Sequence, residues 1–192
     1  MEVLLAQQTA ADVITQFGEA DISGWPFWQR GDAYFARGRA FALLDIGPEG
    51  EADLTRALDF TSDSRSLQKI RLTLGRHREE TLKDDDAALA AYRSVFANRE
   101  QIGGADEFGA VQAAARILAR QKQFDDALAT LSLIDTEQQR GVWRFSTLLA
   151  RGDILLAAGR QDEAVALFQS VLKDSAAEPR FRQQAEQRLQ QR

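Results

Sequence analysis

The sequence contains no cysteine and only one histidine, His77. The absence of cysteine excludes disulfides and thiolate metal ligands, and the single histidine excludes a multi-histidine metal site. We therefore expect no metal and no cofactor, and we place His77 on the surface of its helix.

Proline and β-branched residues are also scarce, with 3 Pro, 7 Val and 8 Ile against 31 Ala. Alanine and unbranched side chains lose little entropy in a helix, whereas β-branched residues favour strands. No apolar run approaches the roughly 20 residues that span a bilayer, and the start, MEVLLAQQ, lacks a basic signal-peptide region. The composition predicts an all-α chain without membrane insertion. As given, the chain favours the cytoplasm; a mature fragment would instead suit the periplasm or envelope.

The charge of the chain is negative, with 24 basic and 29 acidic residues and a net charge of −5 at pH 7. The imbalance is concentrated in residues 1–63, which carry 11 acids and 4 arginines. Nucleic-acid-binding domains usually present a basic face, so this balance argues against nucleic acid as a partner.

Helical periodicity and turn residues divide the chain into an N-terminal helix, helix pairs and a last polar helix. Gly47, Pro48 and Gly50 predict the turn inside the first pair. We expect one domain, residues 1–192, divided as follows: an N-terminal helix and break at 1–22, helix pairs at 24–62, 64–99, 105–135 and 138–175, and a capping helix at 178–192.

Short segments that begin with acids recur along the chain, each with a small residue and then a large one four positions later. They are DDAALAAYRSVF at 85–96, DDALATLSLI at 125–134 and DEAVALFQSVL at 162–172, with a weaker copy, GEADLTRAL, at 50–58. The small residues are Gly50, Ala88, Ala127 and Ala164, at intervals of 38, 39 and 37. This period is typical of stacked helix pairs.

On these residues the chain resembles the tetratricopeptide repeat (TPR) family over about residues 31–175. The family motif has a large residue, a glycine and an aromatic on the first helix, then a small and a large residue on the second. Matching positions are Tyr34, Gly38, Phe41, Leu54 and Ala57 in the first pair, and Leu148, Gly152, Leu155, Ala164, Phe168 and Val171 in the last. The second pair departs from the motif: Gly75 lies one residue early, and Glu79 occupies an aromatic position.

The resemblance implies an α-α superhelix, a TPR-like solenoid of about nine or ten helices in antiparallel pairs. It also implies a scaffold that binds a partner protein or peptide through its concave face and is not an enzyme. Carried over by repeat register, the groove residues are Phe35, Arg39, Thr73, His77, Gln112, Arg116, Arg120 and Asp153. The arginines suggest an acidic partner segment, because guanidinium groups pair well with carboxylates.

Other interpretations stay open at this point. One is an accessory subunit of a bacterial envelope or secretion assembly, another is self-association through the end repeats, and a remote one is an enzyme that uses carboxylates. Trp25, Phe27 and Trp28 are expected to cover the open edge of the first repeat against the N-terminal helix; the alternative is an aromatic docking patch.

Overall fold

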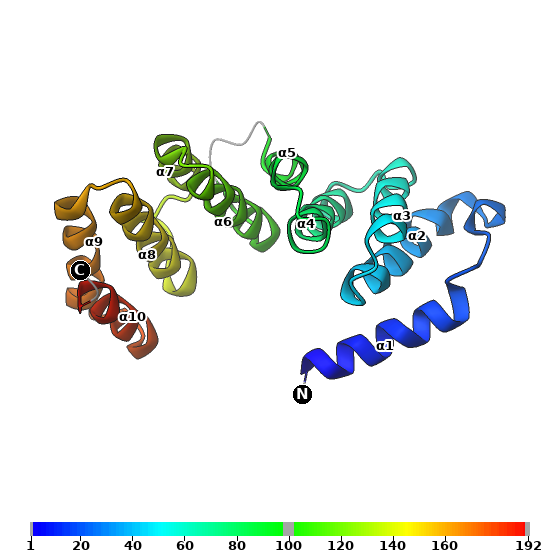
Figure 1. Cartoon of the computed structure of the whole chain (residues 1–192), viewed down its shortest axis with the longest axis horizontal. Coiled ribbons are helices and arrows are strands. Elements are labelled where there is room, and N and C mark those ends of the chain that lie inside the picture. The colour runs from blue at the N-terminus through cyan, green and yellow to red at the C-terminus, as the bar shows by residue number, and fades with distance from the viewer. Residues whose placement is uncertain (1, 98–101, 191–192) are drawn as a thin grey trace. The chain divides into compact units, whose positions relative to one another are not determined.

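The computed structural model describes residues 2–97 and 102–190, and every regular element in these two stretches is a helix. The predicted all-α fold is confirmed. Contacts group the chain into two compact units, Met1–Val95 (unit 1) and Phe96–Arg192 (unit 2). Each unit is described by itself below, with the labels of Figure 1.

Unit 1 contains an N-terminal helix followed by two helix pairs. Its elements are α1 (Glu2–Phe17), the 3-10 turn η1 (Ile22–Gly24), α2 (Phe27–Leu43), α3 (Gly47–Asp59), α4 (Ser64–Glu80) and α5 (Asp85–Val95). Helix α2 packs against α1 and α3, and α4 packs against α3 and α5. This arrangement buries a cluster that includes Ile22, Tyr34, Ala57 and Ile70.

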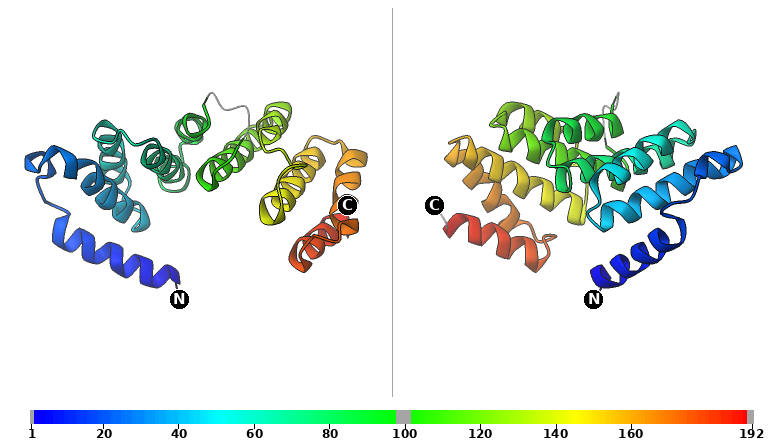
Figure 2. Two further views of the ribbon diagram at one scale, coloured as in Figure 1. Left: turned by 180° about the vertical axis from the view of Figure 1, so that it is seen from behind. Right: turned by 45° about the vertical axis from the view of Figure 1, so that its right-hand side comes forward.

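Unit 2 contains two further pairs and a last helix. Its elements are α6 (Ala105–Arg120), α7 (Phe124–Ser132), α8 (Gly141–Ala157), α9 (Gln161–Lys173) and α10 (Pro179–Gln190). Helix α8 contacts α6, α7 and α9, and α10 lies against α8 and α9, as both views of Figure 2 show. Phe145, Phe168 and Phe181 are buried in the core between them.

One residue in the left-handed region lies between the two helices of each pair. These residues are Asp45, Lys83, Lys122 and Gly159, with φ of 59°, 57°, 61° and 77°. Each lies five positions before the small residue of its repeat, so the turns recur at the same intervals of 38, 39 and 37. The backbone therefore repeats with the period that the side chains predict.

Small residues on the first helices allow the second helices to approach closely. A Cβ atom on Gly38 would lie 3.0 Å from Leu54 Cγ, and one on Gly75 or Gly152 would overlap the ring of Tyr92 or Phe168. Gly75 thus has the same packing role as Gly152. It lies one residue early because eight positions, rather than seven, separate it from the left-handed residue of its turn.

The predicted turn at Gly47, Pro48 and Gly50 is wrong, because all three residues belong to α3. Proline lacks the backbone N–H, but the first helical turn leaves that donor unbonded in any case. The chain instead reverses at Asp45, two residues before the helix begins.

Candidate functional site

The first helices of unit 2, α6 and α8, leave one side of each helix accessible. A cavity of about 270 Å³ lies between them. It is lined by Gln112, Ala115, Arg116, Ala119, Ala150, Asp153, Ile154 and Ala157. We call it the α6–α8 groove. Three residues predicted by repeat register, Gln112, Arg116 and Asp153, thus lie in one cavity.

The lining of this groove alternates between alanine and polar side chains. Alanines at four positions keep the helices from filling the space with their own side chains. Gln112 is held across the groove, where its Nε2 donates to Thr147 Oγ1 at 3.2 Å. The cavity is therefore walled by two helices whose side chains are fixed to each other.

The acidic residue of the groove is paired within the unit. Arg188 of α10 donates to both carboxylate oxygens of Asp153, from Nε at 2.6 Å and from the terminal nitrogen at 2.8 Å. The hydrogen bond with Asp153 raises the pKa of Arg188. This pair balances the Asp153 charge, and the Arg116 guanidinium lies in the same lining.

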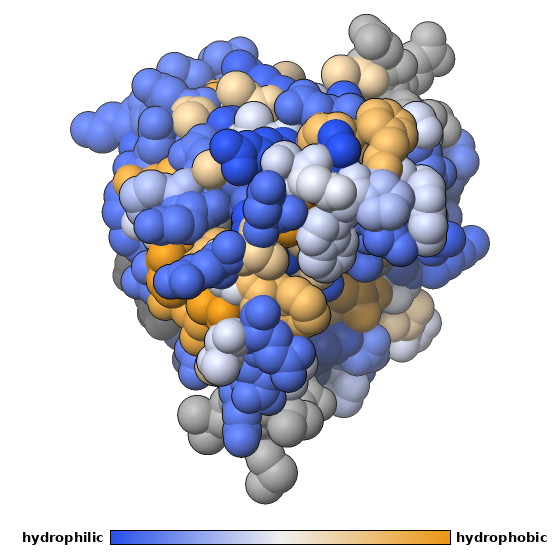
Figure 3. All heavy atoms as spheres, turned by 90° about the vertical axis from the view of Figure 1, so that its right-hand side faces the viewer, coloured by the Kyte–Doolittle hydropathy of each residue, from blue (hydrophilic) through white to orange (hydrophobic). Residues whose placement is uncertain are grey.

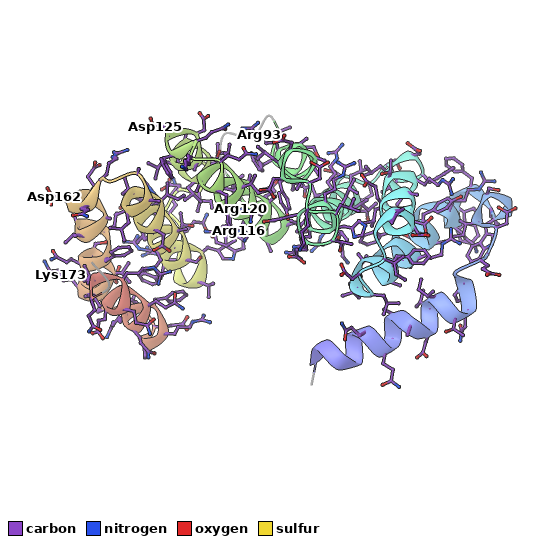
Figure 4. All side chains as sticks on the ribbon, viewed as in Figure 1. Arg93, Arg116, Arg120, Asp125, Asp162 and Lys173 are labelled. Atoms are coloured by element: carbon purple, nitrogen blue, oxygen red, sulfur yellow. The ribbon has the colours of Figure 1, made fainter. Side chains whose placement is uncertain are left out.

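Arg120 lies one helical turn beyond Arg116 on α6, and both guanidinium groups are exposed (Figure 4). Residues four apart on a helix share a face. Arg120 is not among the residues that line the cavity. It places a second guanidinium on the same face of α6, one turn beyond the lining residue Arg116.

The first helices of unit 1 form a second surface, with α2 against α4. Phe35 lies half-buried there, with the Arg39 guanidinium 5.5 Å from its ring centroid and Lys69 Nζ at 5.8 Å. Such distances allow cation–π attraction. Thr73 is half-buried, and its hydroxyl donates to Lys69 O at 2.8 Å, so it is held within its own helix.

The placement of His77 on the surface is wrong, because only 2% of this residue is exposed. Its side chain points to α3, where Nε2–H donates to Gly47 O at 2.7 Å and the ring covers Gly50. His77 therefore belongs to the core between α3 and α4 and does not line a groove.

The aromatic residues before and within α2 behave differently from one another. Trp25 meets Phe17 of α1 edge-on at 6.2 Å, as the expected cover of the first repeat requires. Phe27 packs on Phe60, which follows α3, at 5.5 Å. Trp28 is 75% exposed, so it does not take part in that cover.

Sequence reasoning missed several residues around the two surfaces. Ala150 and Ala157 lie one turn on either side of Asp153, and the helical period from Asp153 would have found both. Lys69 lies one turn before Thr73 and could have been found in the same way. Arg188 carries no such signal, since its position depends on how α10 packs.

Neither a metal cluster nor a membrane-spanning helix is found in the described part of the chain. No group of three or more histidine, cysteine or acidic residues among residues 2–97 and 102–190 could hold a metal ion. No helix within the same residues is long and apolar enough to cross a bilayer.

The helix pairs and their accessible first-helix surfaces define a helical-repeat fold of the protein-interaction kind. A family model, described as the tetratricopeptide repeat-like domain, matches residues 67–191. The chain belongs to the tetratricopeptide repeat-like family. Comparisons with curated proteins and with solved structures gave no match.

Proposed function

We propose that this protein is a scaffold that binds an acidic segment of a partner protein in the α6–α8 groove. The observation that carries the proposal is the cavity between α6 and α8, with Arg116 in its lining and Arg120 beyond it. We propose no catalytic reaction, because repeats of this family are typically non-enzymatic.

The chemistry of the groove supports an extended acidic segment. Its floor is largely alanine and Ile154, which suits the apolar part of a peptide. Guanidinium groups form charge-assisted hydrogen bonds with carboxylates. Asp153 would repel such a peptide if it stood alone, but Arg188 pairs with it at both oxygens.

The size of the cavity also suits a peptide better than a small molecule. Its volume of about 270 Å³ is slightly below the roughly 300–1,000 Å³ of typical small-molecule pockets. It would hold one or two side chains, while the remainder of the segment lies along the exposed side of α6.

The test uses the full chain and a short peptide that contains aspartate, glutamate and leucine. We expect the peptide to bind, and the double variant Arg116→Ala/Arg120→Ala to weaken binding at least tenfold, a change of about 1.4 kcal/mol. Fluorescence polarisation measures the affinity. Ala150→Phe should also weaken binding, because it fills the cavity without changing the charge.

The matched control is Arg93→Ala/Lys173→Ala, which removes two exposed cations, one on α5 of unit 1 and one on α9, neither of which lines the groove. We expect it to change the affinity less than twofold at moderate salt, since isolated surface charges contribute little. Equal losses in the two double variants would show a general charge effect and would refute the groove.

A further inference from the structure

An apolar pocket of about 250 Å³ lies in unit 1, between the end of α1, η1 and the first half of α2. It is lined by Val13, Phe17, Ile22, Trp25, Ala33, Ala36 and Arg37. Phe17 is 41% exposed, although its ring contacts Trp25. Figure 3 looks onto the end of unit 1 where α2 begins and shows hydrophobic surface between hydrophilic side chains. We call the cavity lined by these residues the α1–α2 pocket.

The walls of this pocket are fixed by Arg37. One terminal nitrogen of its guanidinium donates to the carbonyls of Phe17, Gly18 and Ala20, at 3.1, 3.4 and 2.7 Å. The other nitrogens bond both carboxylate oxygens of Asp53, at 2.6 and 3.0 Å. The last carbonyls of a helix need such donors. Arg37 therefore holds the end of α1 in place, and its charge is already paired.

The charges beside the pocket are acidic. Four exposed acids flank lining residues in the sequence: Asp12, Glu19, Asp21 and Asp32. Hydrogen bonds from Ser23 lower the pKa of Asp21. Besides the paired Arg37, the same stretch contains Arg30, which donates its Nε–H to Trp25 O at 2.8 Å and lies over the Phe60 ring. The pocket thus has a largely apolar lining, and the segments that form it carry four exposed acids.

We infer that the α1–α2 pocket is a second docking site, for a basic segment of a partner protein that inserts a bulky apolar side chain. The interior excludes a charged group, and the volume is below the roughly 300–1,000 Å³ of small-molecule pockets. Lysine or arginine on either side of the inserted residue would be attracted by the exposed acids of the segments that form the pocket. Because Arg37 has already ordered the walls, binding costs little rearrangement.

This site has the opposite charge preference to the α6–α8 groove and lies wholly in unit 1. It does not depend on the proposed function. The basic C-terminal helix of a second copy is a poor occupant, because Phe181 and Ala185 of α10 are buried in unit 2. A different protein is therefore the occupant that the structure favours.

The test uses a short amphipathic peptide of leucine and lysine and its leucine and glutamate counterpart, each added to the full chain. Two-dimensional NMR follows the backbone amides of residues 17–25 and the Trp25 indole. We expect the lysine peptide to shift these signals and the glutamate peptide to leave them in place. Asp12→Asn/Glu19→Gln/Asp32→Asn should weaken binding about tenfold, since each exposed pair contributes up to about 1 kcal/mol.

A second triple variant, Glu80→Gln/Glu137→Gln/Glu186→Gln, removes the same charge from exposed positions outside the pocket. It should change the affinity less than twofold. Ala36→Phe should block the pocket while the thermal melt stays cooperative. Shifts outside residues 12–37, equal losses in both triple variants, or Trp25 shifts caused by raising the protein concentration alone would overturn the inference; the last result would identify a second copy as the occupant.

Discussion

Unit 1 and unit 2 are built from the same kind of helix pair, and they fill the space between the helices differently. Among the described residues, unit 1 buries four polar side chains, Arg37, Asp53, His77 and Glu79, whereas unit 2 buries Glu107 and Thr147. The core of unit 2 contains ring contacts such as Phe145 on Phe181 at 5.6 Å. The buried charges of the described chain are therefore concentrated in unit 1.

This difference shows two ways of joining one helix pair to its neighbours. Removing two charges from water costs free energy, and the attraction within a buried ion pair does little more than offset that cost. The pair therefore adds little net stability, yet removing one partner leaves an unpaired buried charge and is strongly destabilising. An apolar contact loses stability roughly in proportion to the atoms removed. We therefore expect unit 1 to be more sensitive to single polar substitutions than unit 2.

The largest expected effect is that of Arg37→Met. It leaves Asp53 buried without its partner and removes the donor from three carbonyls at the end of α1. The expected cost is about 3–5 kcal/mol, measured by urea denaturation. Hydrogen exchange should show the loss of protection in unit 1, with unit 2 little changed.

The double variant Arg37→Met/Asp53→Leu tests the cause of that loss. With both charges replaced by apolar groups, a substantial part of the stability should return, because no unpaired charge stays buried. Arg93→Met, at an exposed position on α5, should change stability by less than about 0.5 kcal/mol. If Arg37→Met lowers the free energy of unfolding by less than about 1 kcal/mol, the ion pair is not as important for the stability of unit 1 as we expect.

A smaller effect is expected for Tyr92→Phe, which makes unit 1 resemble unit 2. Tyr92 OH donates to the buried Glu79 carboxylate at 2.9 Å, whereas unit 2 has Phe168 and Leu155 at the matching repeat positions. Loss of a hydrogen bond to a buried charged group costs about 1–3 kcal/mol, which thermal or urea unfolding measures.

The matched variant is Glu79→Leu/Tyr92→Phe, which copies the residues of the last repeat. Replacing both partners with apolar groups of similar shape is often close to neutral. We expect the double variant to be more stable than Tyr92→Phe alone. Additive losses in the two single variants would mean that Tyr92 and Glu79 are not coupled.

Local patterns in the sequence were sufficient to predict the helix pairs. The small residues that set the 37 to 39 spacing are local signals, and the left-handed turn residues precede them at a constant distance. The irregular second pair also has a local explanation. Gly75 lies one position early because eight positions, rather than seven, separate it from the left-handed residue of its turn. Glu79 is accommodated at an aromatic position because it accepts a hydrogen bond from the Tyr92 hydroxyl.

Polar contacts between distant helices could not be predicted in this way. His77 has the sequence context of a surface residue, and its burial depends on α3, where Gly47 O accepts from the ring and Gly50 leaves room for it. The bond from Arg188 to Asp153 joins residues 35 positions apart. Three residues of the α6–α8 groove could be predicted from repeat register, because a position in the repeat depends only on the helical period. Charge pairing depends on tertiary packing and could not be predicted.

The smallest expected effect concerns acid and again contrasts the two units. The Asp63 carboxylate caps α4 in unit 1, where it accepts the Ser66 N–H at 2.7 Å. Hydrogen bonds with Ser66 lower the pKa of Asp63 below its unfolded value. Its contribution to stability is therefore complete above the unfolded pKa and is lost as the pH falls through the lower, folded pKa.

Asp63→Asn separates the cap from the charge. Asparagine caps a helix about as well as aspartate, so stability at pH 7 should change little, while the acid dependence of hydrogen exchange in unit 1 becomes shallower. The matched variant in unit 2 is Glu163→Gln, because the pKa of Glu163 is lowered by Arg160, which bonds both of its oxygens at 2.7 Å. Added salt should weaken the Glu163 effect more than the Asp63 effect, since an exposed ion pair is screened and a cap hydrogen bond is screened less. Equal salt sensitivity of the two variants would show that Asp63 acts through general charge and not through the cap.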